Sequence, residues 1–323
     1  MSATALALIL VAALAHATWN LFSKQAAAAG ASSFVWLMSL TATGLYAPVV
    51  AVSVLLSPPR LTLLDWVFMA GTGLLQVGYF LFLQAGYRLG DLSLVYPLGR
   101  GSGALLAALA GIIVLGERPG PAGITGIVLV VLGVLVLGTP GRGDGFPARV
   151  PPGGAARPGG PESTGGPEST GGPESPGGPA RPRLSRAIVF ALVTGTFIAS
   201  YTLWDKYAVS TLRVPPLIQG YASLPVMALV LAPSALRQRG RTARVWRGYR
   251  RQVTGAAVLS PLAYILVLIA MSFTAVSAVA PAREVSVLAG VLLGRRLLGE
   301  GNLARRLAAA AAIAAGIICI AVG

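Results

Sequence analysis

The sequence predicts an all-α polytopic membrane protein with ten transmembrane helices in two inverted five-helix repeats. Composition is the first of three observations behind this prediction: of 323 residues, 55% are hydrophobic and 11% charged, whereas soluble domains carry about 25% charged residues. The second is a series of ten apolar runs, most of them near the about 17–25 residues that cross a bilayer. The third is that the second half of the chain repeats landmarks of the first in the same order, as expected of a duplication.

The predicted spans divide the chain into two halves separated by a polar gap. The first half (1–138) contains the runs 4–22, 32–55, 66–87, 92–115 and 122–137. The second half (187–323) contains the runs 187–207, 215–232, 253–273, 277–293 and 307–322. The first run is interpreted as a retained helix rather than a cleaved signal peptide, because no Lys or Arg precedes it.

The gap between the halves, residues 139–186, is predicted to be a disordered linker. It contains the tandem hexads GGPEST, GGPEST and GGPESP. Gly and Pro dominate and apolar side chains are nearly absent, so this segment cannot bury enough surface to fold.

The duplication also predicts how the halves enter the membrane. The matched pairs are Trp19 and Trp204, Asn20 and Asp205, and Tyr79 and Tyr264 at a separation of 185 positions, then Arg100 and Arg283, and Glu117 and Glu300 at 183. Five spans is an odd number, so the second half must enter from the opposite side. Inverted repeats of this kind place the substrate site near the midplane, between the halves.

The fourth run shows the features that matter most for the interior. Arg100 lies well inside it, and an arginine at the centre of a bilayer helix costs about 2.5–3.5 kcal/mol even on a lenient scale. Its position therefore indicates a water-accessible cavity or a buried partner. Small residues recur every four positions and predict close helix packing; they are Gly99, Gly103, Ala107 and Gly111. Glu117 and Glu300 follow the runs and suit helix capping or loop pairing.

The predicted substrate-binding residues are polar, charged or aromatic side chains on the spans, because such groups are costly against lipid. They are His16, Trp19, Asn20, Tyr79, Tyr96, Arg100, Tyr201, Trp204, Asp205, Tyr264, Arg283 and Glu284. Two interpretations stay open for the α-helical face with His16 and Asn20: it lines a cavity, or it bonds to neighbouring helices. Arg100 and Arg283 have two interpretations. Either they bind an anionic group of the substrate or pair with a carboxylate that gates the cavity, or they are held by backbone carbonyls and support the fold. Lys24 and Lys206 are interpreted as snorkelling residues at helix ends.

Composition also excludes several classes of site. The chain has one cysteine and one histidine, so no disulfide within the chain, metal site or cofactor is expected. The net charge of +15 resides in loops and the linker, which the positive-inside rule explains without nucleic acid.

The pattern resembles the EamA-type transporters of the drug/metabolite transporter superfamily. The resemblance rests on the five-plus-five layout, on Trp19, Asn20 and Lys24 in the first run, and on Pro97-x-x-Arg100 followed by Gly116-Glu117-Arg118. It implies a secondary transporter, commonly an exporter of metabolites, amino acids or drugs. It also implies termini in the cytoplasm, whereas the Lys and Arg residues concentrate in the odd-numbered loops and place the termini outside.

The sequence thus predicts a transporter of the plasma membrane that moves a small organic solute by alternating access, as an exporter, and not an enzyme. The expected partners are the lipid bilayer and the solute, with no nucleic acid, and the chain acts as a monomer or a homodimer. Proton coupling would require Asp205, Glu284 or His16 to change charge. The alternative is a membrane scaffold or accessory subunit without turnover.

Overall fold

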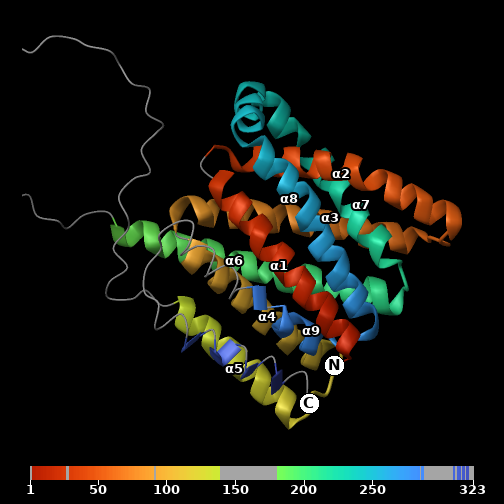
Figure 1. Cartoon of the computed structure of the whole chain (residues 1–323), viewed down its shortest axis with the longest axis vertical. Helices are drawn as coiled ribbons and strands as arrows, with labels where there is room; N and C mark the ends of the chain where they lie inside the picture. Colours follow the sequence, from red (N-terminus) through yellow and green to blue (C-terminus); the bar gives the residue numbers. More distant parts are fainter. Residues whose placement is uncertain are drawn as a thin grey trace, which may run out of the picture.

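The computed structural model describes residues 2–26, 29–90, 92–138, 180–283, 285–286 and, near the end of the chain, 308–309, 311–313, 315–316 and 318–319. Throughout these residues the structure is helical and contains no strand. The elements are α1 (Ala3–Ala26), α2 (Ala31–Leu56), α3 (Leu63–Leu89), α4 (Leu92–Val114), α5 (Pro121–Gly138), α6 (Ala180–Lys206), the π-helical η1 (Tyr207–Thr211), α7 (Pro216–Arg237), α8 (Arg239–Phe273) and α9 (Val276–Ala282). Figure 1 shows them as one bundle.

Six of these helices are long and apolar enough to cross a membrane: α1, α2, α3, α6 with η1, α7 and α8. Two shorter apolar helices, Leu98–Val114 and Pro121–Val134, match the fourth and fifth predicted spans. The ninth and tenth predicted spans are described only in part, at 277–283 and 285–286, and at 308–309, 311–313, 315–316 and 318–319. The structure therefore bears out a multi-span helical protein, while ten spans stay a prediction. The predicted linker, 139–186, is likewise outside them up to residue 179.

Local sequence explains where several helices begin and end. Thr62 and Asp65 form a capping box that starts α3, with the Asp65 carboxylate accepting from the Thr62 N–H at 2.7 Å. Pro216 occupies the first turn of α7, where its missing N–H costs nothing. Gly116 has φ +67, the left-handed conformation that favours glycine, just after α4 ends.

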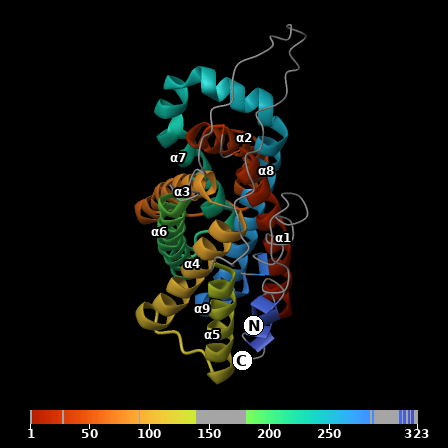
Figure 2. The ribbon, with the colours of Figure 1, turned by 90° about the vertical axis from the view of Figure 1, so that its left-hand side faces the viewer.

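The two halves of the chain pack into each other through equivalent pairs of helices. The first helix of each half contacts the third helix of the other half: α1 packs along α8, and α6 packs along α3. The second helices, α2 and α7, pack together. Each also contacts the third helix of the other half: α2 contacts α8, and α7 contacts α3. Figures 1 and 2 both show α1 and α8 side by side. The interior is therefore built jointly by the two halves.

The third helices of the two halves, α3 and α8, end on opposite sides of the bundle. The Lys24 ammonium, near the end of α1, donates to the carbonyls of Tyr87 and Gly90 at the end of α3, at 2.7 and 2.6 Å. Helix α8 instead ends near the start of α1, because Ser2 and Thr274 line the same cavity. Since α1 has 24 residues, or about 36 Å at about 1.5 Å per residue, α3 and α8 end on opposite sides of the bundle.

Lys206 repeats the contact of Lys24 in the second half. Its ammonium donates to the carbonyls of Met271 and Thr274 at the end of α8, both at 3.0 Å. Each half therefore uses a lysine from its first helix to satisfy the carbonyls that end its third helix, where cations are favoured. Both lysines thus bind helix ends within the bundle, and snorkelling to the interface stays a prediction.

Glycines bring α4 and α6 into backbone contact, as the small-residue pattern predicts. A Cβ on Gly195 of α6 would lie 2.9 Å from the Gly103 nitrogen and 3.0 Å from the Gly99 oxygen. A Cβ on Gly103 would lie 2.7 Å from the Ile198 Cβ. Backbone atoms cannot rotate away, so this approach requires glycine.

Substitution of Gly195→Ala should lower the free energy of unfolding by about 1–3 kcal/mol, because the added methyl overpacks the α4–α6 contact. The matched control is Gly44→Ala on α2, where nothing lies within 4 Å of the added Cβ and the change should be neutral or stabilising. Thermal unfolding in detergent measures both. Equal effects of the two substitutions would contradict the close approach.

Candidate functional site

The centre of the bundle contains a cluster of polar, charged and aromatic side chains contributed by both halves. Ten of the predicted substrate-binding residues are buried, each 9% exposed or less. They are His16, Trp19 and Asn20 on α1, Tyr79 on α3, Tyr96 and Arg100 on α4, Tyr201 and Asp205 on α6, Tyr264 on α8, and Arg283 just after α9. Trp204 is half-buried, and Glu284 lies outside the described residues.

Asp205 is the most heavily hydrogen-bonded member of this cluster. Its Oδ1 accepts from the Thr72 hydroxyl at 2.6 Å and from the Gln219 side-chain amide at 3.2 Å. Its Oδ2 accepts from the Tyr264 hydroxyl. The donors come from α3, α7 and α8, so one carboxylate joins four helices. Moving a carboxylate out of water is very costly without such partners, and bonds to a charged acceptor are the stronger kind.

Thr72 and Gln219 were not among the residues predicted from the sequence. Both are fully buried on spans, and the Gln219 amide also donates to the Thr72 hydroxyl at 2.9 Å. Neither has a polar counterpart at the repeat spacing, since Ala257 and Phe34 occupy the matching positions. The available signal was their polarity within apolar runs, which did not distinguish them from other buried polar groups.

Three tyrosines form a row through the interior. Tyr201 packs edge-on against Tyr79 and Tyr264, with ring centroids 5.7 and 6.2 Å apart. Tyr79 and Tyr264 are the matched pair of the two halves, and Tyr201 lies between them. The Tyr79 hydroxyl is buried and has no hydrogen-bond partner among the described residues, so it remains available to a polar group of a ligand.

Arg100 and Arg283 point into the bundle and not into lipid, at 2% and 4% exposure. The Arg100 Nη1 lies 3.4 Å from the His16 Nε2. Arg283 is near enough for its charge to act on His16, Tyr79 and Asp205. Its Nη2 has no hydrogen-bond partner among the described residues. The two arginines therefore flank the same interior region, as the cavity interpretation requires.

On α1, some predicted residues lie in the central cluster and one bonds to a neighbouring helix. Trp19 packs on His16 and Phe80, with centroids at 5.6 and 5.4 Å, inside the cluster. Asn20 instead bonds within the bundle: its amide donates to the His16 carbonyl at 2.8 Å, and its oxygen accepts from the Tyr87 hydroxyl at 2.7 Å. Asn20 therefore acts as an interhelical contact in this structure.

Trp204 lies apart from the cluster although Asp205 is its neighbour. Its indole N–H donates to the Phe68 carbonyl at 2.8 Å, and its ring stacks on the Phe68 ring with centroids 4.3 Å apart. Gly71 provides the space, since a Cβ there would lie 2.7 Å from the indole. Consecutive residues project about 100° apart on a helix, and here Asp205 faces the centre while Trp204 faces the start of α3.

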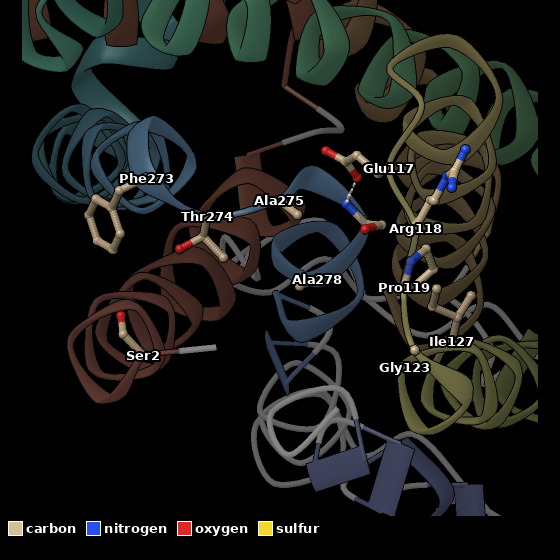
Figure 3. Close-up of a pocket in the computed structure, with 12 residues that line it drawn as sticks. Ser2, Glu117, Arg118, Pro119, Gly123, Ile127, Phe273, Thr274, Ala275 and Ala278 are labelled. Carbon is tan, nitrogen blue, oxygen red and sulfur yellow. Dashed lines mark hydrogen bonds between the residues drawn. The ribbon is translucent and has the colours of Figure 1, made fainter.

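A cavity of about 400 Å³ opens at the end of the bundle where α1 begins. Ser2, the α4–α5 connection and the α8–α9 connection line it (Figure 3). Glu117 extends from the α4–α5 connection toward the first turn of α9, where its carboxylate accepts from the N–H groups of Val276 and Ser277 at 2.9 and 2.8 Å. This confirms the predicted capping role of Glu117.

The central cluster combines charged, polar and aromatic groups in one place. In the part of the chain that the structure describes, no group of three or more His, Cys, Asp or Glu residues could hold a metal ion. The cluster offers one hydrogen-bonded carboxylate, two guanidinium groups, an imidazole and a wall of aromatic rings. Such groups can hold a small solute with charged and apolar parts.

The fold and the cluster define a class: a polytopic helical membrane protein with a polar interior at the junction of two repeated halves. The chain belongs to the EamA-like transporter family, whose model matches residues 3–139 and 185–322. The sequence resemblance is thereby confirmed, and the chain is a membrane transporter of small solutes. One solved crystal structure superposes on the whole chain with a TM-score of 0.66 at 16% identity and is covered over 98% of its own length. No curated protein matches.

Substitution of Tyr264→Phe should lower the free energy of unfolding by about 1.5–3 kcal/mol, because the Asp205 carboxylate loses a donor in a dry interior. Thermal unfolding in detergent provides the measurement. The control is Tyr207→Phe, because this half-exposed tyrosine stacks on Phe68 through its ring and should tolerate loss of its hydroxyl. If the two variants unfold alike, the Tyr264 bond contributes nothing.

Proposed function

We propose that the protein is a secondary transporter that exports a small organic solute across the plasma membrane by alternating access of its two halves around the central cluster. The observation that carries the proposal is the buried junction of Asp205, Arg100 and Arg283, to which both halves contribute. Burying three charged groups in a bilayer protein is costly, and such residues mark substrate or ion pathways.

The same geometry supports a proposal for the membrane topology. We infer ten spans in two inverted five-helix repeats, 1–138 and 187–323, joined by the linker. The opposite directions of α3 and α8 support the inversion. The arginines between residues 237 and 251 lie at the end of the bundle where α1 finishes, which favours that end as the cytoplasmic one.

The solute class follows from the groups that converge. The guanidinium groups suit a carboxylate or phosphate, which arginine binds through two parallel bonds. The tyrosine row and Trp19 suit an apolar or aromatic portion. An amphipathic metabolite that carries an anionic group fits both features. Both halves belong to one chain, so a single copy contains the whole cluster.

In this mechanism, the two lysine contacts keep the two ends of the bundle closed. Lys24 holds the end of α3 at one side of the bundle, and Lys206 holds the end of α8 at the other. The described central residues are buried, which supports our interpretation of this arrangement as a form closed to both sides. Transport requires one lysine contact to open while the other persists.

Purified protein reconstituted in vesicles should accumulate or release members of a panel of anionic, zwitterionic and cationic amphipathic solutes. Asp205→Asn and Arg283→Gln should each lower the rate at least about tenfold, because a buried charged hydrogen bond is worth about 1.5–3 kcal/mol. The control, Arg60→Gln, changes an exposed residue outside the cluster. Failure of the protein to move or bind any solute would favour the scaffold alternative.

Proton coupling makes a separate prediction. If Asp205 carries the proton, transport by the wild type should depend on a proton gradient, whereas the residual transport of Asp205→Asn should not. Glu284→Gln serves as the parallel test at the other candidate acid. A gradient dependence that both variants retain would exclude these carboxylates as the coupling groups.

Alternating access predicts opposite changes at the two ends. Leu89 and Thr274 occupy equivalent, half-buried positions beside the Lys24 and Lys206 contacts. Leu89→Cys and Thr274→Cys are each introduced in a Cys319→Ser background and labelled with a soluble maleimide. Addition of solute should raise the labelling rate of one variant and lower that of the other. Parallel shifts, or none with a transported solute, would contradict the mechanism.

A further inference from the structure

The end of α7 and the first part of α8 concentrate positive charge without any acidic residue. Seven arginines lie between residues 237 and 251, a stretch that contains no Asp or Glu. All seven are exposed. The hydrogen bonds of two of them go to neutral acceptors: Arg241 donates to the Gln238 side chain and Arg244 to the Gly240 carbonyl. Neither of these two bonds neutralises positive charge, and the stretch itself contributes no acidic group.

The length of α8 places these arginines beyond the hydrocarbon. Of its 35 residues, the 24 from 250 to 273 that follow Tyr249 already measure about 36 Å at about 1.5 Å per residue, against a hydrocarbon core of about 30 Å. Its apolar portion occupies the C-terminal side, where Tyr264 lies in the central cluster. The first turns of α8 must therefore extend to the level of the lipid headgroups or past it.

A kink turns this extension across the end of the bundle. Tyr249 has φ −130 and ψ 24 within α8, which departs from helical geometry. Figure 2 shows the first part of α8 crossing the bundle before the helix turns downward along α1. The first part of α8 therefore does not continue straight out of the bundle, and this orientation suits a helix at the membrane surface.

One face of the extension is fixed to α2. The Thr242 hydroxyl lies 3.0 Å from the Ser33 hydroxyl and donates to the Ala235 carbonyl at 2.9 Å. Val245 is fully buried near Gly30. Arg244 and Arg247 lie one turn apart and are exposed, and Trp246 is 41% exposed beside them. The extension is thus a rigid support for a basic face that also carries an indole.

We propose that this arginine platform, the exposed arginines from 237 to 251 together with Trp246, binds the headgroups of anionic phospholipids. Guanidinium groups bind phosphate oxygens through paired hydrogen bonds, and Trp favours the membrane–water interface. Juxtamembrane basic clusters attract anionic lipids. The inference does not depend on the transported solute.

Bound lipid should also stabilise the bundle. The platform joins α7 to α8 and rests on α2, so a ligand that binds only this folded arrangement raises the free energy of unfolding by mass action. The stabilisation should weaken as salt rises, because exposed charges are screened.

The test titrates the full-length protein in neutral detergent with phosphatidylglycerol or phosphatidylcholine and follows lipid adducts by native mass spectrometry and unfolding by temperature. Phosphatidylglycerol should bind more tightly and raise the unfolding temperature more. Arg244→Gln combined with Arg247→Gln should weaken its binding by roughly tenfold or more, since each basic residue near an anionic surface contributes on the order of fivefold. Arg60→Gln with Arg213→Gln, the same charge change at the opposite end of the bundle, should leave it unchanged.

A second readout locates the bound lipid. Phosphatidylglycerol brominated in its acyl chains should quench the fluorescence of Trp246. Total tryptophan quenching should therefore fall more in Trp246→Phe than in Trp66→Phe. Equal affinity for the two lipids, equal effects of the two arginine pairs, or no quenching at Trp246 would each overturn the proposal. Equal competition by soluble polyphosphate and phosphatidylglycerol would assign the platform to polyanions and likewise overturn it.

Discussion

The structure depends on the placement of charged side chains inside an apolar bundle. Asp205, Arg100 and Arg283 lie where a bilayer protein has no water to solvate them, so each must find polar partners within the protein. Asp205 does so by taking donors from α3, α7 and α8. Those donors belong to both halves, and the halves are therefore connected through a polar centre as well as through apolar packing.

Each half satisfies the unpaired carbonyls at the end of its third helix in the same way. A lysine near the end of the first helix of each half satisfies the carbonyls at the end of the third helix, once on each side of the bundle. The centre is less symmetric, because Asn20 bonds to Tyr87 whereas its match, Asp205, bonds to Thr72, Gln219 and Tyr264. Duplication provided the scaffold, and divergence at this matched position placed a carboxylate in one half and a neutral amide in the other.

The ends of the bundle differ more than its interior. The end where α1 begins has the cavity lined by the α4–α5 and α8–α9 connections, with the Glu117 carboxylate engaged by the start of α9. The other end has the basic extension of α8 supported by α2. The two ends therefore carry different charge and different cavities even though the helices repeat.

The sequence alone determined the class of fold, because a segment in lipid must satisfy its backbone internally and must be long enough to cross, so apolar runs reveal helices directly. It also determined that Arg100, Arg283 and Asp205 face inward, since lipid penalises charge. Only the tertiary structure decided that Thr72 and Gln219 serve Asp205, that Trp204 turns to Phe68, and that α8 bends at Tyr249. These contacts join residues far apart in the chain, or depend on how each helix is rotated against its neighbours, and no local pattern specifies that rotation.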